Sequence, residues 1–253
     1  MGFVKSSPER ALFMTADIGV LLGVVAIAGL TQGVTGFGFG LLSMGLMVVL
    51  FPLQDAVVIV AILGLGLSLL NLWTVRTSIP WKEASSILLT ALPAIALGNY
   101  FLRTLPLQVL RGGIAIMILI GCAVSLWTPQ KALIHHPFPW AHLAGLVGGV
   151  FGGALNMGGP PAVLYTLLRG WEKSTAKGFL VAYFVPTSIL RVILLSLTGM
   201  VTRKNLIQGG ALLVPAILFG YLGTRIFQRI STRIFRYLAT VLLLGLAIKI
   251  ILS

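Results

Sequence analysis

The chain has 253 residues, of which 58% are hydrophobic and only 9% are charged, and its formal net charge is +13. This composition excludes a soluble domain, in which about 25% of the residues are charged. The apolar runs are about 20 residues long, which predicts membrane-crossing helices rather than barrel strands of about 10 residues. The 18 Lys and Arg residues are spread over the loops. This excludes a nucleic-acid-binding patch and is typical of cations that set topology and contact anionic lipid headgroups, with a general attraction for anions as the alternative.

The predicted elements form an all-α integral membrane protein with two pseudo-repeats. Residues 1–16 are an N-terminal tail, 17–127 the first transmembrane repeat, 128–139 a polar linker and 140–253 the second transmembrane repeat. Each repeat consists of one broken helical element followed by three transmembrane helices. In the first repeat we expect these at 17–51, 56–75, 84–102 and 107–127, and in the second at 140–168, 178–200, 206–227 and 235–252.

The first broken element is interrupted by four glycines within residues 33–40. Each glycine weakens a helix by about 1 kcal/mol relative to alanine. An open backbone at membrane depth is tolerated only where protein surrounds it or where it lines a cavity. Gly36, Gly38 and Gly40 recur at every second position, which is not a helical stripe, so packing alone does not explain them.

The second broken element is interrupted by Asn156-Met157-Gly158-Gly159-Pro160-Pro161. Consecutive prolines are tolerated at a helix start, where the missing N–H groups have no partner in any case. A half-helix is therefore expected from Pro160 to about Leu168, with Leu41–Leu50 as its counterpart in the first repeat. Other glycines fit a packing role, because Gly145, Gly149 and Gly153 recur at i, i+4 and i+8, and Gly29 and Gly33 do the same.

The two halves resemble each other at a spacing of roughly 120 positions, as in Pro93–Gly98 and Pro215–Gly220. Each broken element is too long for one crossing of about 20 residues and too short for two. A re-entrant hairpin fits this length, and three further crossings would then invert the second repeat. Eight simple crossings are the alternative. Only in the inverted arrangement do the Lys and Arg residues gather more on one face of the membrane than on the other. By the positive-inside rule that face is cytoplasmic. Its loops are 76–82, 131, 169–177 and 225–236.

The two half-helix N-termini would meet near the membrane midplane and present free N–H groups to an anion. A cation site built from backbone carbonyls is the opposing interpretation. The predicted substrate-binding residues are Gln32, Thr35, Gly36, Phe37, Gly38, Phe39, Gly40, Asn71, Asn156, Met157, Gly158, Gly159, Pro160 and Arg191. Among them Gln32, Thr35 and Asn156 would add side-chain donors.

Arg191 is the charged residue that lies closest to the middle of a predicted crossing. A charge in the membrane costs at least about 2.5–3.5 kcal/mol and normally faces a cavity or a partner. We therefore expect it to neutralise a bound anion, with snorkelling to the interface as the alternative. Asn71 is its counterpart in the first repeat, and the hydroxyl groups of Thr187 and Ser188 are expected near the path.

The sequence disfavours an enzyme and predicts neither a cofactor nor a metal site. The five acidic residues lie at segment ends or in loops, and the single cysteine, Cys122, lies in an apolar run. No acid–histidine pair or metal-ligand cluster falls in a predicted crossing. An accessory subunit is also disfavoured, because a scaffold gains nothing from broken helices.

The doubled pattern of Gly33–Gly38, Asn156–Pro161 and the two Pro-Ala-Ile segments resembles the sulfite exporter (TauE/SafE) family of membrane transporters, over about residues 18–250. The resemblance implies a multi-pass carrier in the cytoplasmic (inner) membrane. It would export a small anion such as sulfite, a sulfonate like sulfoacetate, or a related organic acid. A passive anion channel and an uptake carrier are the alternatives. The apolar outer faces suit lipid or a second copy equally, so the sequence also allows a homodimer.

Overall fold

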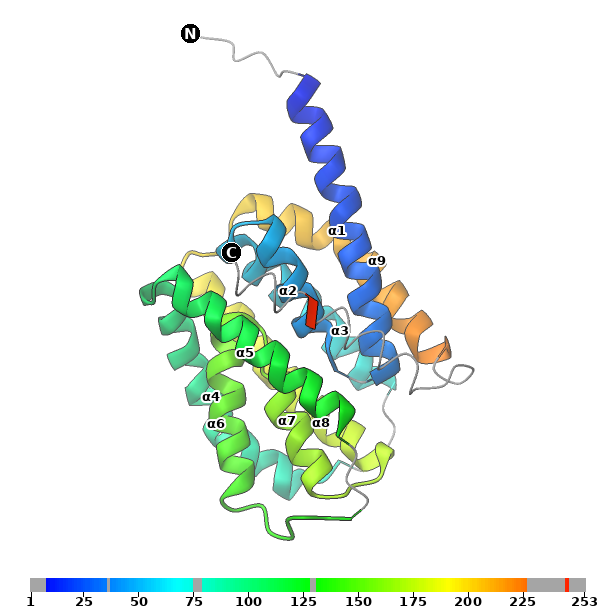
Figure 1. Cartoon of the computed structure of the whole chain (residues 1–253), viewed down its shortest axis with the longest axis vertical. Coiled ribbons are helices and arrows are strands. Elements are labelled where there is room, and N and C mark those ends of the chain that lie inside the picture. The colour runs from blue at the N-terminus through cyan, green and yellow to red at the C-terminus, as the bar shows by residue number, and fades with distance from the viewer. Residues whose placement is uncertain (1–7, 36, 75–78, 128–130, 227–243, 246–253) are drawn as a thin grey trace.

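The computed structural model of the protein describes residues 8–35, 37–74, 79–127, 131–226 and 244–245. The regular elements in these residues are all helices, arranged as Figure 1 shows. They are α1 (Pro8–Thr35), α2 (Phe39–Leu50), α3 (Leu53–Thr74), α4 (Trp81–Thr104), α5 (Leu107–Leu126), α6 (Trp140–Leu155), α7 (Gly159–Leu168), α8 (Lys173–Leu197) and α9 (Arg203–Ile226).

Five of the described helices, α3, α4, α5, α8 and α9, are long and apolar enough to cross a membrane. They agree with the five crossings predicted at these positions. The sixth, at 235–252, lies outside the described residues except for 244–245. The largest difference from a predicted boundary is at α1, which begins at Pro8 and so includes residues 8–16 that the sequence assigns to a tail. In Figure 1 the N-terminal half of α1 projects away from the other helices.

Both predicted helix breaks are present. α1 ends at Thr35 and α2 begins at Phe39, with Gly38 before it in a left-handed conformation of φ 102°. A side chain would strain that backbone, which explains the glycine there. α6 ends at Leu155, and Asn156 follows in the left-handed region at φ 58° before α7 begins at Gly159. Asparagine tolerates this conformation better than most residues.

Glycines let α6 pack directly against the backbone of α4. A Cβ added at Gly145, Gly149 or Gly153 would overlap the backbone oxygens of Ile87, Ala91 and Ile95, respectively. The predicted packing role of this glycine stripe is therefore confirmed. The residue numbers of the contacting positions increase together along the two helices, so α4 and α6 run parallel.

The same kind of contact joins α1 to α9. A Cβ added at Gly29 would lie 3.2 Å from the backbone oxygen of Ala216, and one added at Gly33 would overlap the backbone oxygen of Gly220. These two helices also run parallel. The first and second breaks are thus each carried by a helix, α1 or α6, that is fixed along one side by glycine contacts with a membrane-crossing helix.

α3 and α8 cross between the two breaks in opposite directions. The hydroxyls of Ser68 and Ser188 lie 3.3 Å apart in a buried hydrogen bond. Further along α3, Asn71 shares a small cavity with Lys177, which lies earlier on α8. Because the residue numbers rise along α3 in the direction in which they fall along α8, the two helices run antiparallel.

Polar contacts hold the ends of the helices together. Arg169, after α7, forms an ion pair of 2.9 Å with Glu83 at the start of α4. The linker joins the same end, because the backbone N–H of Leu133 donates to the carbonyl of Leu168 at 2.8 Å. At another corner Lys204 lies 3.9 Å from Asp55.

We expect Gly153→Ala to lower the thermal unfolding midpoint in detergent, because its Cβ would force α6 away from α4. Overpacking of this kind costs typically about 1–3 kcal/mol. Gly210→Ala is the matched control, since a Cβ on this exposed α9 glycine meets no atom within 4 Å. Equal unfolding midpoints for the two variants would contradict the packing role.

Candidate functional site

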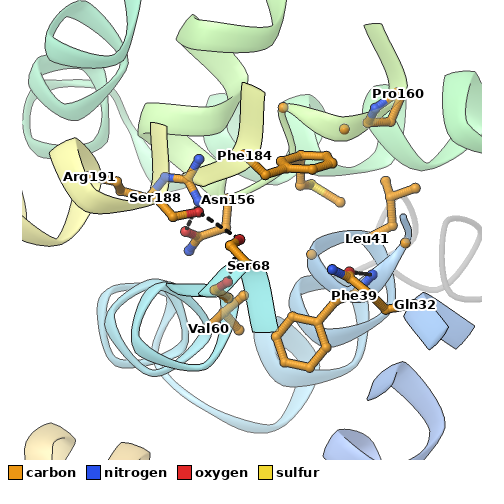
Figure 2. Close-up of a pocket in the computed structure, with 16 residues that line it drawn as sticks. Gln32, Phe39, Leu41, Val60, Ser68, Asn156, Pro160, Phe184, Ser188 and Arg191 are labelled. Carbon is orange, nitrogen blue, oxygen red and sulfur yellow. Dashed lines mark hydrogen bonds between the residues drawn. The ribbon is translucent and has the colours of Figure 1, made fainter. Parts of the chain in front are cut away.

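A cavity lies where the two helix breaks meet α3 and α8 (Figure 2). It offers about 50 Å³ to the centres of water molecules, whereas one water needs about 10–15 Å³. The space is therefore sufficient for a few waters or a small ion. The residues that line it are Gln32, Gly38, Phe39, Gly40, Leu41, Val60, Gly64, Ser68, Asn156, Met157, Gly158, Gly159, Pro160, Phe184, Ser188 and Arg191.

The two breaks touch each other at this cavity. A Cβ added at Gly40, in the first turn of α2, would overlap the backbone oxygen of Asn156 at the second break. A glycine is required at position 40 for this approach. The sequence leads us to expect that the two breaks meet, and the tertiary structure shows that Gly40 and Asn156 are the residues in contact.

Arg191 is buried, with 8% of its surface exposed, and its guanidinium faces the cavity. Its Nη1 donates a 2.8 Å hydrogen bond to Oδ1 of Asn156. The Asn156 amide in turn donates to the backbone oxygen of Val57 on α3 at 2.7 Å. Arg191 therefore does not snorkel to the interface.

The charge of Arg191 has no acidic partner within the described residues. The ion pairs there are those of Arg169 with Glu83 and of Lys204 with Asp55. Within the same part of the chain, Nε of Arg191 makes no hydrogen bond. A buried cation with spare donors at a cavity wall is suited to an anion that enters the cavity.

The two half-helix N-termini differ in what they offer to the cavity. At α2, the side-chain oxygen of Gln32 accepts a 3.2 Å hydrogen bond from the backbone N–H of Phe39, so this oxygen caps the helix. At α7, Pro160 and Pro161 have no N–H to donate. The first turn of α2 therefore presents more donors than that of α7, an asymmetry that the sequence prediction of two similar N-termini overlooks.

The comparison with known families decides the kind of protein to which this cavity belongs. The family model described as sulfite exporter TauE/SafE matches residues 21–250. The chain belongs to the TauE/SafE family. It is thus a member of a family of multi-pass membrane transporters of sulfite-type anions rather than of a family of enzymes. No curated protein and no solved structure matches the chain significantly.

Most of the predicted site residues of this TauE/SafE protein line the cavity. They are Gln32, Gly38, Phe39, Gly40, Asn156, Met157, Gly158, Gly159, Pro160 and Arg191. Phe37 instead packs, half-buried, against the apolar core. Thr35 ends α1 but its side chain is not described, and Gly36 lies outside the described residues. Asn71 lies apart from these residues, because it lines a second, smaller cavity.

Sequence reasoning missed the contribution of α3 and that of Phe184 on α8. The cavity also includes Leu41, Val60, Gly64, Ser68 and Phe184. Extending the repeat spacing of 120 positions would have paired Ser68 with Ser188, which are bonded in the structure. Ser188 lines the cavity as expected, whereas the Thr187 hydroxyl donates to the backbone oxygen of Tyr183, within its own helix, at 2.7 Å.

Asn156→Ala should lower the free energy of unfolding by about 1–3 kcal/mol, because the Val57 carbonyl and Arg191 would both lose a buried partner. Gln108→Ala removes an amide from the exposed side of α5 and serves as the control, with a change of less than about 0.5 kcal/mol. Unfolding in detergent measures both variants. Equal effects would show that the Asn156 bridge contributes nothing.

Proposed function

We propose that this protein exports a small anion across the cytoplasmic (inner) membrane through the cavity between its two helix breaks. The substrate would be sulfite, a sulfonate such as sulfoacetate, or a related small organic anion. The observation that carries this proposal is Arg191, a buried cation at the cavity wall with no acidic partner among the described residues.

The polar groups around the cavity favour an anion over a cation. The Asn156 side-chain oxygen, which would suit a cation, already accepts from Arg191. Peptide N–H groups at the start of α2 can donate to oxyanion atoms. The Ser68 hydroxyl donates to the backbone oxygen of Gly64 at 2.7 Å, so Ser188 is the serine whose proton can turn from Ser68 to an anion. A carbonyl-based cation site would have to withstand the positive charge of Arg191 in a medium of low dielectric constant.

Outward transport suits this arrangement energetically. An anion that leaves a cell with a negative interior gains about 2.3 kcal/mol per charge for each 100 mV of membrane potential. Export therefore needs no coupling ion. Uptake would need one, or a protonated substrate.

The inverted arrangement of two re-entrant repeats belongs to the same proposal, and three observations support it. Antiparallel α3 and α8 suit inverted halves, whereas eight simple crossings would make these helices parallel. Two contacts join segments that would lie on opposite faces of the membrane if the chain made eight simple crossings. They are the ion pair of Glu83 with Arg169 and the backbone hydrogen bond of Leu133 to Leu168. In addition, α1 corresponds to α6 and α9 corresponds to α4 when the two halves are exchanged, so the contact of α1 with α9 is the counterpart of that of α6 with α4.

Arg191→Gln should reduce the flux of radiolabelled sulfite from proteoliposomes by at least about tenfold, since loss of a charge-assisted hydrogen bond costs about 1.5–3 kcal/mol. Arg191→Lys keeps the charge and should retain part of the flux. Arg103→Gln, which removes an exposed arginine at the end of α4, is the matched control and should transport normally.

The dependence of the flux on sulfite concentration distinguishes a carrier from a channel. A carrier saturates with sulfite concentration, whereas flux that rises linearly would favour the passive channel. Unchanged flux in Arg191→Gln, at the same amount of folded protein, would remove Arg191 from the site. The same vesicles loaded with sulfoacetate, thiosulfate and short carboxylates rank the substrates.

Single cysteines test the topology in a Cys122→Ser background. Lys131→Cys and Glu172→Cys should react with an impermeant thiol reagent from the same face of the membrane, and Thr202→Cys from the opposite face. All three positions are exposed. Labelling of positions 131 and 172 from opposite faces would support eight simple crossings instead.

A further inference from the structure

One face of α8 carries a cation at each end. Apart from Val181, the residues that line cavities on this helix recur at intervals of three or four, so they form a single stripe. In order they are Lys177, Leu180, Phe184, Ser188 and Arg191. The two cations are 14 positions apart along the sequence, which corresponds to about 21 Å along the helix axis.

The Lys177 end of this stripe lines a second cavity. Its walls are Ser68, Asn71, Lys177, Leu180, Val181 and Phe184. Ser68 and Phe184 also line the central cavity. They are therefore the partition between the two spaces, and no other residue lines both.

Lys177 is placed to attract an anion before it reaches the central cavity. Its side chain is half-buried, and it forms no ion pair within the part of the chain that the structure describes. It lies in the second turn of α8, near the end of the molecule that holds the Glu83–Arg169 pair. Asn71 lines the same cavity.

We propose that the transported oxyanion first loads at this second cavity, with Lys177 as its cation and Asn71 beside it. The cavity offers about 10 Å³ to the centres of water molecules, room for about one water, so the Leu180 and Phe184 side chains must move for the anion to enter. The anion binds there first and then passes the Phe184–Ser68 partition to reach Arg191. This inference rests on the anion-transport function proposed above. It assigns the entry route to the end of the molecule where α8 begins.

The local composition fits this order of events. A cation at the mouth of a passage raises the local concentration of an anion and its rate of association. The partition consists of one aromatic ring and one hydroxyl, and the ring of Phe184 also lies 3.6 Å from the position of a Cβ on Gly159. An anion that moves past it leaves the solvent-side cation and meets the buried one.

The test is saturable efflux of sulfite from proteoliposomes by Lys177→Gln. We expect the KM for sulfite to rise about threefold to tenfold, while the maximal flux stays within about twofold, because Lys177 acts before the slow crossing. Lys177→Arg should restore the KM. Lys82→Gln removes an exposed lysine that lines neither cavity and should leave the KM unchanged.

Chemical rescue keeps the test independent of folding. In a Cys122→Ser background, Lys177→Cys is allowed to react with an aminoethyl methanethiosulfonate, which restores a cation, or with the methyl reagent, which does not. Only the aminoethyl reagent should return the KM toward the wild-type value. The same pair of reagents at Lys82→Cys should have no effect.

The outcomes separate this inference from the function on which it rests. If Arg191→Gln loses flux but Lys177→Gln and Lys82→Gln have the same KM, the loading site is wrong and Lys177 serves topology or lipid contact. If the wild type carries no sulfite or sulfonate flux, the proposed function itself is wrong. Rescue by both reagents alike would also overturn the role of the charge.

Discussion

Asn156 connects the elements on which the cavity depends. It ends α6 in a left-handed conformation, its amide bonds to Val57 of α3, its oxygen accepts from Arg191 of α8, and its backbone oxygen touches Gly40 of α2. Four elements thus converge on one residue. The two side-chain bonds also orient the guanidinium and partly satisfy a buried cation, whose isolation in the membrane would be costly.

Glycine contacts supply the rigid frame around this point. α6 and α1 approach their partners so closely that their backbones touch, at Gly153 against α4 and at Gly33 against α9. In lipid, where apolar helices gain little by mutual hydrophobic burial, close packing of this kind is a main source of association. The frame fixes both breaks, while α3 and α8 cross between them and contribute side chains.

The chemistry of the two halves differs although their elements correspond. α3 and α8 are antiparallel about the Ser68–Ser188 contact. Asn71 lies one turn after Ser68 on α3, and Arg191 lies one turn after Ser188 on α8. Because the two helices are antiparallel, these residues lie on opposite sides of the serine contact. One side holds Arg191 and the central cavity, and the other holds Lys177, Asn71 and the smaller cavity.

The sequence by itself determined the membrane class, the two breaks, the glycine stripes and the presence of a charge, Arg191, within a membrane crossing. Each of these follows from local rules, namely hydropathy, helix propensity and the cost of a buried charge. The tertiary structure decided that Gly40 meets Asn156, that Ser68 and Phe184 line the central cavity, and that Asn71 lies outside it. A serine or phenylalanine in an apolar helix carries no local sign of its partner, because that partner is set by how distant helices cross.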